Sequence, residues 1–217
     1  MSIAVVNEET EKYLHENLDI LCCPKCRGLL SLVNGGLRCS ACQQPYDVDS
    51  NIPLLFWPNE WDASKEDKTA VVKSFYEATP FPNYDDLDDL KALSEKAGQA
   101  MFPKLLADQL PMEARVLDCG CGTGQWSNFL SMEGRSVFGT DACINSLKLA
   151  QQFKEKHDLS TVHFLQMNLF RPIFRPASFD LVICNGVLHH TSDPYLGFKT
   201  IAKLVKPNGH IYGGTLS

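Results

Sequence analysis

The sequence predicts an α/β protein in which a parallel sheet follows a small metal-stabilised segment. Three observations support this prediction. Two C-x-x-C pairs lie near the N-terminus, a glycine-rich stretch directly follows an apolar run in the middle of the chain, and further apolar runs then alternate with helical stretches. Alternating strands and helices are typical of right-handed β-α-β units, whose strands lie parallel in one sheet. The 217 residues suffice for one medium domain and one small domain.

The composition indicates a globular protein with a hydrophobic core. Hydrophobic residues make up 44% of the chain, the net charge is −6, and no block of Lys or Arg would trace a phosphate backbone. Duplex nucleic acid is therefore not the expected partner. No apolar run reaches the roughly 18 residues that span a bilayer, and the N-terminus lacks a basic start followed by an apolar core. We expect a cytoplasmic protein.

Four cysteines near the N-terminus have the spacing of a structural zinc site. Cys23 and Cys26 form one C-x-x-C pair, Cys39 and Cys42 form another, and twelve residues separate the pairs. A reducing compartment favours metal binding over disulfides. Four thiolates complete a closed tetrahedral Zn²⁺ site with no open position for a substrate. Cys22 adjoins Cys23 but lacks C-x-x-C spacing to Cys26, so Cys23 is the predicted ligand.

The segment between the two cysteine pairs is expected to form a hairpin. Residues 29–33 and 36–40 fit short strands, and Asn34-Gly35-Gly36 is a favourable tight turn. Such a zinc ribbon buries little surface, so metal binding is expected to drive its folding. The stretches LDILCCPKC at 18–26 and NIPLLF at 51–56 resemble the Trm112-like zinc-ribbon family. That resemblance implies a ribbon that accompanies a methyltransferase, either fused to it or as a partner protein.

Residues 58–110 are expected to connect the ribbon to the main domain. The segment begins with a polar stretch, and Pro80 and Pro82 keep the T-P-F-P sequence extended. Its aromatic side chains allow two interpretations, a lid over a ligand pocket or simple docking on the main domain, and docking is favoured. These side chains are Phe75, Tyr76, Phe81 and Tyr84.

The sequence DCGCGTG at 118–124 is expected to form a tight loop between a strand and a helix. An apolar run at 114–118 precedes it, and helical spacing of apolar residues begins near Gln125. Glycines let the backbone turn sharply and approach a ligand, and the free N–H groups at a helix start favour a polar group. A dinucleotide fingerprint, G-x-G-x-x-G, requires glycine where Gln125 stands, so a nicotinamide cofactor is not favoured.

Cys119 and Cys121 within this loop are expected to be small residues that line the turn. Neither has a C-x-x-C partner, which disfavours a second metal site. A redox pair is the alternative interpretation.

Four further apolar runs extend the predicted sheet, and polar residues follow three of them. The strands are expected at 114–118, 136–141, 161–167, 179–184 and 210–214. Asp141 ends the second, while Asn168 and Asn185 directly follow the third and fourth. The carboxyl ends of parallel strands lie at one edge of a sheet, so these side chains should meet at a ligand site. An acid at the end of the second strand suits hydrogen bonds from both ribose hydroxyls.

These motifs together resemble the class I S-adenosylmethionine-dependent methyltransferases, specifically the methyltransferase type 11 or UbiE-like group. The resemblance is carried by VLDCGCGTG at 116–124, Asp141, QMNLF at 166–170 and FDLVICNGVLHH at 179–190. It implies a Rossmann-like, doubly wound parallel sheet, S-adenosylmethionine as the cofactor, and transfer of a methyl group.

The resemblance also implies a role for each matching residue. The implied cofactor contacts are Asp118, Gly120, Gly122, Gly124, Asp141, Asn168 and Asn185. The glycines would admit the methionine part, Asp118 would hold its amino group, and Asp141 would bind the ribose. Asn168 would accept the adenine amino group, less strongly than the aspartate that many relatives place there.

His189 and His190 are the candidate catalytic residues. An activated methyl donor requires mainly that the acceptor be positioned and deprotonated, and proximity supplies much of the rate. A histidine beside the fourth strand is suited to act as a base for a hydroxyl acceptor. The alternative is that these histidines pack or orient the loop, and that interpretation is favoured.

The predicted organisation is a zinc ribbon at 15–57, a connector at 58–110 and a Rossmann-like domain at 111–217. The chain ends soon after the fifth strand, where this fold usually adds a C-terminal hairpin, so we expect either a fragment or a shortened fold. The leading functional hypothesis is methylation of a hydroxyl or amine on a small molecule. The alternatives are an RNA methyltransferase and a non-catalytic module that binds cofactor or docks a partner.

Overall fold

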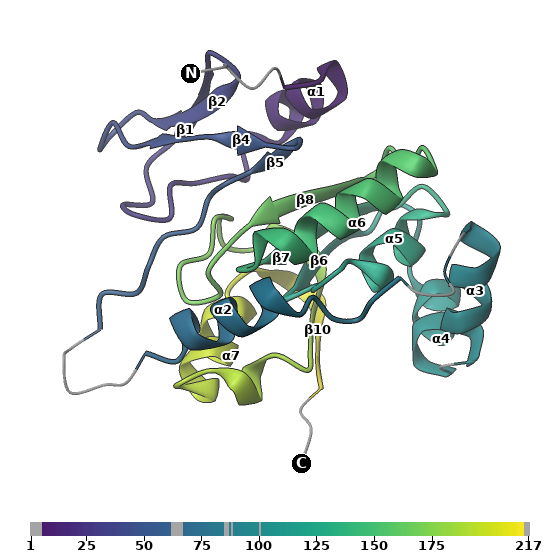
Figure 1. The fold of residues 1–217 in the computed structure, drawn as a ribbon. Coiled ribbons are helices and arrows are strands. Elements are labelled where there is room, and N and C mark those ends of the chain that lie inside the picture. The colour runs from purple at the N-terminus through teal and green to yellow at the C-terminus, as the bar shows by residue number, and fades with distance from the viewer. Residues whose placement is uncertain (1–5, 62–66, 85–86, 88, 100, 215–217) are drawn as a thin grey trace.

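A five-stranded parallel sheet forms the centre of the structure (Figure 1). The computed structural model describes residues 6–61, 67–84, 87, 89–99 and 101–214. The strand order is β10-β9-β6-β7-β8, and every pairing in this sheet is parallel. The strands are β6 (Arg115–Cys119), β7 (Ser136–Asp141), β8 (Val162–Gln166), β9 (Phe179–Asn185) and β10 (Val205–Gly214). This arrangement confirms the predicted doubly wound α/β sheet.

The strand order reverses beside β6, because β7 and β8 extend the sheet on one side and β9 and β10 on the other. The helices that follow these strands are α5 (Gln125–Ser131), α6 (Ile144–Lys156) and α7 (Pro194–Ala202), with the short 3₁₀ helix η1 at Leu188–His190. In open α/β sheets, ligands bind outside the carboxyl ends of the strands at such a switch point. The topology therefore locates a candidate site beyond the ends of β6 and β9.

Strands β6 to β9 are buried on both faces, which explains their near-continuous apolar character, whereas the edge strand β10 has no fully buried residue. All five residues of β8 are buried. Among the described side chains four phenylalanines are fully buried, and three of them, Phe138, Phe174 and Phe179, meet edge to face at centroid distances of 4.8–5.6 Å. Aromatic rings favour such tilted contacts, which add to the burial of their large apolar surfaces.

The N-terminal region contains a helix and several short strands. These elements are α1 (Glu8–Asn17), β1 (Leu30–Val33), β2 (Gly36–Cys39), β3 (Pro45–Tyr46), β4 (Val48–Asp49) and β5 (Ile52–Pro53). The predicted hairpin is present, since β1 pairs antiparallel with β2. Asn34 and Gly35 both have positive φ, 52° and 77°, as a two-residue hairpin turn of type I′ requires.

The N-terminal region packs against the β8 edge of the sheet (Figure 1). Leu54 forms a parallel bridge with Gln166 at the end of β8, and Leu21 forms an antiparallel bridge with Phe174. The two regions share one continuous cluster of buried residues. The β8 edge is therefore covered by the chain's own ribbon region, which limits edge-to-edge association there.

The connector contains three helices, α2 (Thr69–Ala78), α3 (Leu90–Gln99) and α4 (Met101–Gln109). Tyr84 docks this segment, because its hydroxyl donates to the Thr123 carbonyl at 2.8 Å and accepts from Asn128 Nδ2 at 2.9 Å. The Tyr84 ring also stacks on Phe153 at 4.8 Å. Tyr84 therefore agrees with the favoured docking interpretation. Two other connector aromatics, Tyr76 and Phe81, line a cavity that is described below.

The fifth strand is longer than expected. It begins at Val205, and its pairing with β9 is irregular between Val205 and His210. Among the described residues, β9 is the only strand that pairs with β10. No helix in the described part of the chain has the length and apolar character needed to cross a membrane.

Candidate functional site

A cavity of about 500 Å³ lies at the carboxyl ends of the sheet strands. Its walls include seven of the predicted site residues: Asp118, Gly120, Gly122, Asp141, Asn168, Asn185 and His190. These residues come from four different strands or the loops that follow them, and the topology brings them together at the switch point. Gly124 and His189 are the two predicted residues of this site that do not line the cavity.

The glycine-rich loop requires glycine for steric reasons at two cavity positions. Gly120 and Gly122 have φ values of 78° and 55°, which side chains rarely adopt. A Cβ at Gly120 would overlap Val187, and one at Gly122 would lie 2.5 Å from the Phe81 carbonyl oxygen. The loop is therefore held between the segment after β9 and the connector, with its backbone facing the cavity.

Gly124 has a packing role in the structure, and the cofactor contact implied for it stays a prediction. Its φ is 73°, and an added Cβ would lie 2.6 Å from Ala150 Cβ and 2.7 Å from Phe164 Cε1. The third glycine thus allows the start of α5 to pack closely against α6 and β8. The next residue, Gln125, does line the cavity, and its side chain donates to the Asn83 carbonyl at 2.7 Å.

Replacing Gly124 with alanine is expected to destabilise the fold by about 3 kcal/mol, since the change adds both overpacking and an unfavourable left-handed conformation. Denaturant unfolding would measure the effect. Gly98 is the matched control, because it lies within α3 with nothing within 4 Å of an added Cβ. Gly98→Ala should stabilise the protein slightly. Equal stability of Gly124→Ala and the parent chain would contradict the packing role.

Asp118 is a buried carboxyl group at the end of β6. Ser127 Oγ donates to Asp118 Oδ2 at 2.8 Å. The pKa of Asp118 is raised to about 7, mainly by burial and to a smaller extent by the neighbouring Asp141 carboxylate. The hydrogen bond from Ser127 opposes this rise by lowering the pKa. A cationic group in the cavity would favour the ionised form, as expected for a residue that binds an ammonium group.

Asp141 is held by backbone donors on both oxygens. Its Oδ2 accepts from the Gly122 N–H at 2.9 Å, and its Oδ1 accepts from the Cys143 N–H at 2.8 Å. Burial raises the pKa of Asp141, while these N–H groups oppose the rise. A carboxylate can accept about four hydrogen bonds, so each oxygen retains acceptor capacity for a ligand hydroxyl.

Asn168 links the cavity to the segment after the ribbon. Its Nδ2 donates to the Trp57 carbonyl and to Asn59 Oδ1, each at 2.9 Å, and its Oδ1 accepts from the Phe170 N–H at 3.1 Å. Both N–H donors of the Asn168 amide bind within the chain. A ligand could therefore interact with this side chain only by donating a second hydrogen bond to Oδ1. Trp57 and Asn59 could not be predicted as partners of Asn168, because they lie more than 100 residues away in the chain.

The two candidate histidines have different environments. His190 lines the cavity, and its ring centroid is 6.2 Å from that of Tyr76 in an edge-on contact. His189 Nδ1 is buried without a hydrogen-bond partner among the described residues. Burial lowers the pKa of His190, and the neighbouring His189 lowers it further. His190 is thus the neutral imidazole that a small acceptor in the cavity would meet.

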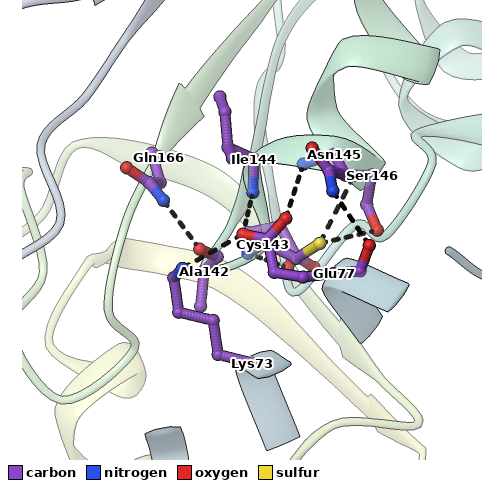
Figure 2. Close-up of polar contacts among 9 residues, drawn as sticks. Lys73, Glu77, Ala142, Cys143, Ile144, Asn145, Ser146 and Gln166 are labelled. Carbon is purple, nitrogen blue, oxygen red and sulfur yellow. Dashed lines mark hydrogen bonds and ion pairs between the residues drawn. The ribbon is translucent and has the colours of Figure 1, made fainter. Parts of the chain in front are cut away.

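Helix α2 of the connector forms an outer wall of the cavity. Its lining residues recur at i, i+3, i+4 and i+7, which places them on one face of the helix; they are Thr69, Val72, Lys73 and Tyr76. Figure 2 shows Glu77, the next residue, reaching the first residues of α6. Lys73 and Glu77 could not be identified from the sequence, because isolated charged residues in a polar connector form no recognisable motif.

The predicted metal ligands also come together. The Sγ atoms of Cys23, Cys26, Cys39 and Cys42 all lie within 4.8 Å of one another. The closest pairs are 3.7 Å for Cys23 and Cys42 and 3.4 Å for Cys26 and Cys39. Tetrahedral zinc with bonds of about 2.3 Å requires sulfur atoms roughly 3.8 Å apart, so the cluster fits Zn²⁺. Cys22 points elsewhere, with its Sγ 3.9 Å from the Pro172 carbonyl oxygen.

The remaining cysteine prediction concerns the glycine-rich loop. Cys119 and Cys121 are buried and line the cavity, and none of the nine cysteines, all of which lie in the described part of the chain, forms a disulfide. This geometry agrees with small residues that line a turn.

Comparison with known proteins identifies relatives of the sheet region. A family model described as a methyltransferase domain matches residues 117–213. The ubiquinone biosynthesis O-methyltransferase of Paracidovorax citrulli is 34% identical over 104 residues, which cover 48% of this chain and 44% of that protein. The Vibrio cholerae protein of the same name is 32% identical over 103 residues, covering 48% and 42%. The chain spans less than half the length of these curated relatives.

A solved structure supports the same fold. The PH0226 protein from Pyrococcus horikoshii OT3 is 25% identical, covers 64% of each chain and superposes with a TM-score of 0.51. The family match runs from β6 to β10 and contains Asp118, Asp141 and Asn168. Residues 117–213 therefore match a methyltransferase domain, in agreement with the resemblance to the class I S-adenosylmethionine-dependent methyltransferases.

Proposed function

We propose that this chain transfers the methyl group of S-adenosylmethionine to a hydroxyl group of an uncharged small molecule. The observation that carries the proposal is a single cavity in which six of the seven predicted cofactor residues, all except Gly124, face the same space as His190. The cofactor supplies an activated methyl group bound to a sulfonium. The chain would bind it, position the acceptor in line with it and accept the acceptor's proton.

The cofactor residues divide the binding task by their chemistry. Asp141 would accept the two ribose hydroxyls through the lone pairs that its backbone donors leave open. Asp118 would accept the ammonium group of the methionine part, and Asn168 Oδ1 would accept the adenine amino group. Gly120 and Gly122 line the cavity without side chains, so the methionine part would approach β6 closely there.

The cavity walls favour an acceptor with an apolar body. Aromatic and aliphatic side chains predominate near β9 and the connector, including Tyr76, Phe81, Trp126 and Val187. Lys73 is the sole lysine or arginine among the described lining residues, and it lies 3.0 Å from Glu77 Oε1. An anionic acceptor would therefore lack a free cationic partner there. The matched relatives are O-methyltransferases by name, which favours a hydroxyl over an amine.

We also infer that Zn²⁺ occupies the four-cysteine cluster as a structural ion. Four thiolates fill its tetrahedral coordination, so the ion has no position for a substrate. The ribbon region packs on β8 of its own chain, which suggests a role within this molecule. A partner protein for the ribbon stays a prediction.

The test of the proposed reaction uses catechol as the hydroxyl probe and aniline as the amine probe. S-adenosylhomocysteine formation from catechol is expected with the parent chain. His190→Gln should lower kcat by about 100-fold and leave KM for the cofactor unchanged, because the base is lost while the cofactor contacts remain. His189→Gln is the matched control and should retain most of kcat.

Two results would contradict this proposal. Unaltered turnover in His190→Gln would remove the histidine as the base. Cofactor binding without product from either probe would favour the non-catalytic alternative.

A further inference from the structure

Helix α2 covers the cavity without a core of its own. No residue in this helix is fully buried, although its inner face lines the cavity. On its outer face, Val71 and Phe75 are 68% and 62% exposed. Most surface helices are held by an apolar face that packs on a core. The position of α2 therefore depends on a few specific contacts.

The contacts of Glu77 anchor the C-terminal end of α2. Its Oε1 accepts from the Ile144 N–H at 3.1 Å, and its Oε2 accepts from the Asn145 N–H at 3.2 Å (Figure 2). Asn145 Nδ2 donates back to the Glu77 carbonyl at 2.9 Å. Lys73 Nζ lies 3.0 Å from Glu77 Oε1. A carboxylate at the start of a 13-residue helix is favourably placed relative to the helix dipole.

The site of this anchor adjoins the predicted ribose contact. Ile144 follows the turn Asp141-Ala142-Cys143, all three residues of which line the cavity. Asp141 binds this turn from the cavity side through the Cys143 N–H, while Glu77 binds the next two N–H groups from the α2 side. One short turn is thus held by two carboxylates, one expected to touch the cofactor and one from the wall that covers it.

The other end of α2 has a separate attachment. The backbone N–H of Lys68 donates to Ser192 Oγ at 2.8 Å, in the loop after η1. Helix α2 therefore spans from the start of α6 to the loop that follows His190. Specific contacts therefore hold both ends of α2.

We propose that Glu77 is a positioning residue that holds α2 as the outer wall of the cofactor cavity and thereby sets how long the cofactor stays bound. The proposal rests on the cofactor part of the proposed function. The proposal predicts an effect on binding kinetics, because α2 would have to move away from the cavity before the cofactor is released. Loss of the anchor should accelerate dissociation of the cofactor more than it slows association.

The test measures association and dissociation rates of S-adenosylhomocysteine by surface plasmon resonance on the immobilised full chain. Glu77→Ala is expected to raise the dissociation rate about tenfold, since it removes two charge-assisted hydrogen bonds. Glu77→Gln, which retains one acceptor oxygen, should show a smaller increase. Asn145→Ala provides a second route to the same effect, because it removes the bond to the Glu77 carbonyl and leaves the carboxylate in place.

Glu9→Ala is the matched control. Glu9 of α1 pairs with the buried Lys154 of α6 at 2.8 Å, so it also fastens an N-terminal element to α6, but neither residue lines the cavity. This variant should lower the thermal unfolding temperature and leave the dissociation rate unchanged. Equal dissociation rates for Glu77→Ala and the parent chain, or the same increase in Glu9→Ala, would overturn the positioning role alone. Failure of the parent chain to bind S-adenosylhomocysteine would overturn the cofactor site itself and the positioning role with it.

Discussion

Replacing Asp141 with alanine is expected to weaken the binding of S-adenosylhomocysteine by about 100-fold, or about 2.7 kcal/mol. Asp141 is expected to accept both ribose hydroxyls, and a hydrogen bond to a charged group contributes about 1.5–3 kcal/mol. The carboxylate also receives the N–H groups of Gly122 and Cys143. The variant therefore loses the ribose acceptor together with the group that shapes the surrounding turn. Calorimetric titration of the full chain measures the affinity.

Asp180→Ala is the matched control for this experiment. Asp180 of β9 is also held by a backbone donor, the Arg115 N–H at 2.9 Å, and it pairs with Lys206 Nζ at 2.8 Å, but it does not line the cavity. Its loss should reduce the free energy of unfolding without changing cofactor affinity. Unchanged affinity in a folded Asp141→Ala variant would contradict the assignment of the ribose position.

The sheet and most of the cavity residues could be predicted because both depend on local patterns. An apolar run followed by a polar residue marks each strand end, and parallel strands bring those ends to one edge. Asp118, Asp141 and Asn168 therefore meet without any knowledge of side-chain contacts. The cysteine spacing similarly predicts the four-sulfur cluster, since each C-x-x-C turn places two thiolates beside one ion.

The features that the sequence did not predict depend on contacts between distant segments. Gly124 lies in the expected loop, but its role follows from Ala150 and Phe164, which approach it from later elements. Glu77 contacts residues 67 and 68 positions away, and Asn168 binds Trp57 across 111 positions. No periodicity specifies which segments cover the end of a sheet. The sequence raised a connector lid only as the less favoured alternative, and the contacts that hold α2 as the outer wall were visible only in the structure.

Removing Zn²⁺ is expected to unfold the ribbon while the sheet keeps most of its structure. The ribbon strands are two to four residues long, and metal binding to zinc-finger peptides contributes on the order of 10–16 kcal/mol to their folding. After metal removal with a strong chelator, amide hydrogen exchange of β1 and β2 should accelerate by at least about 1,000-fold, as expected for loss of their folding energy. Exchange in β6 and β7, which lie inside the sheet, should change far less.

Two cysteine variants separate the loss of zinc from the loss of a buried thiol. Cys39→Ala removes a predicted ligand and should reproduce the exchange pattern of the metal-free protein. Cys22→Ala removes a neighbouring thiol that is equally buried but lies outside the cluster, so zinc content and ribbon protection should remain. If the amides of β1 and β2 remained protected from exchange in metal-free Cys39→Ala, the hydrophobic core shared with the sheet would be sufficient to keep the ribbon folded without Zn²⁺. The same loss in both variants would instead assign Cys22 a part in binding the metal.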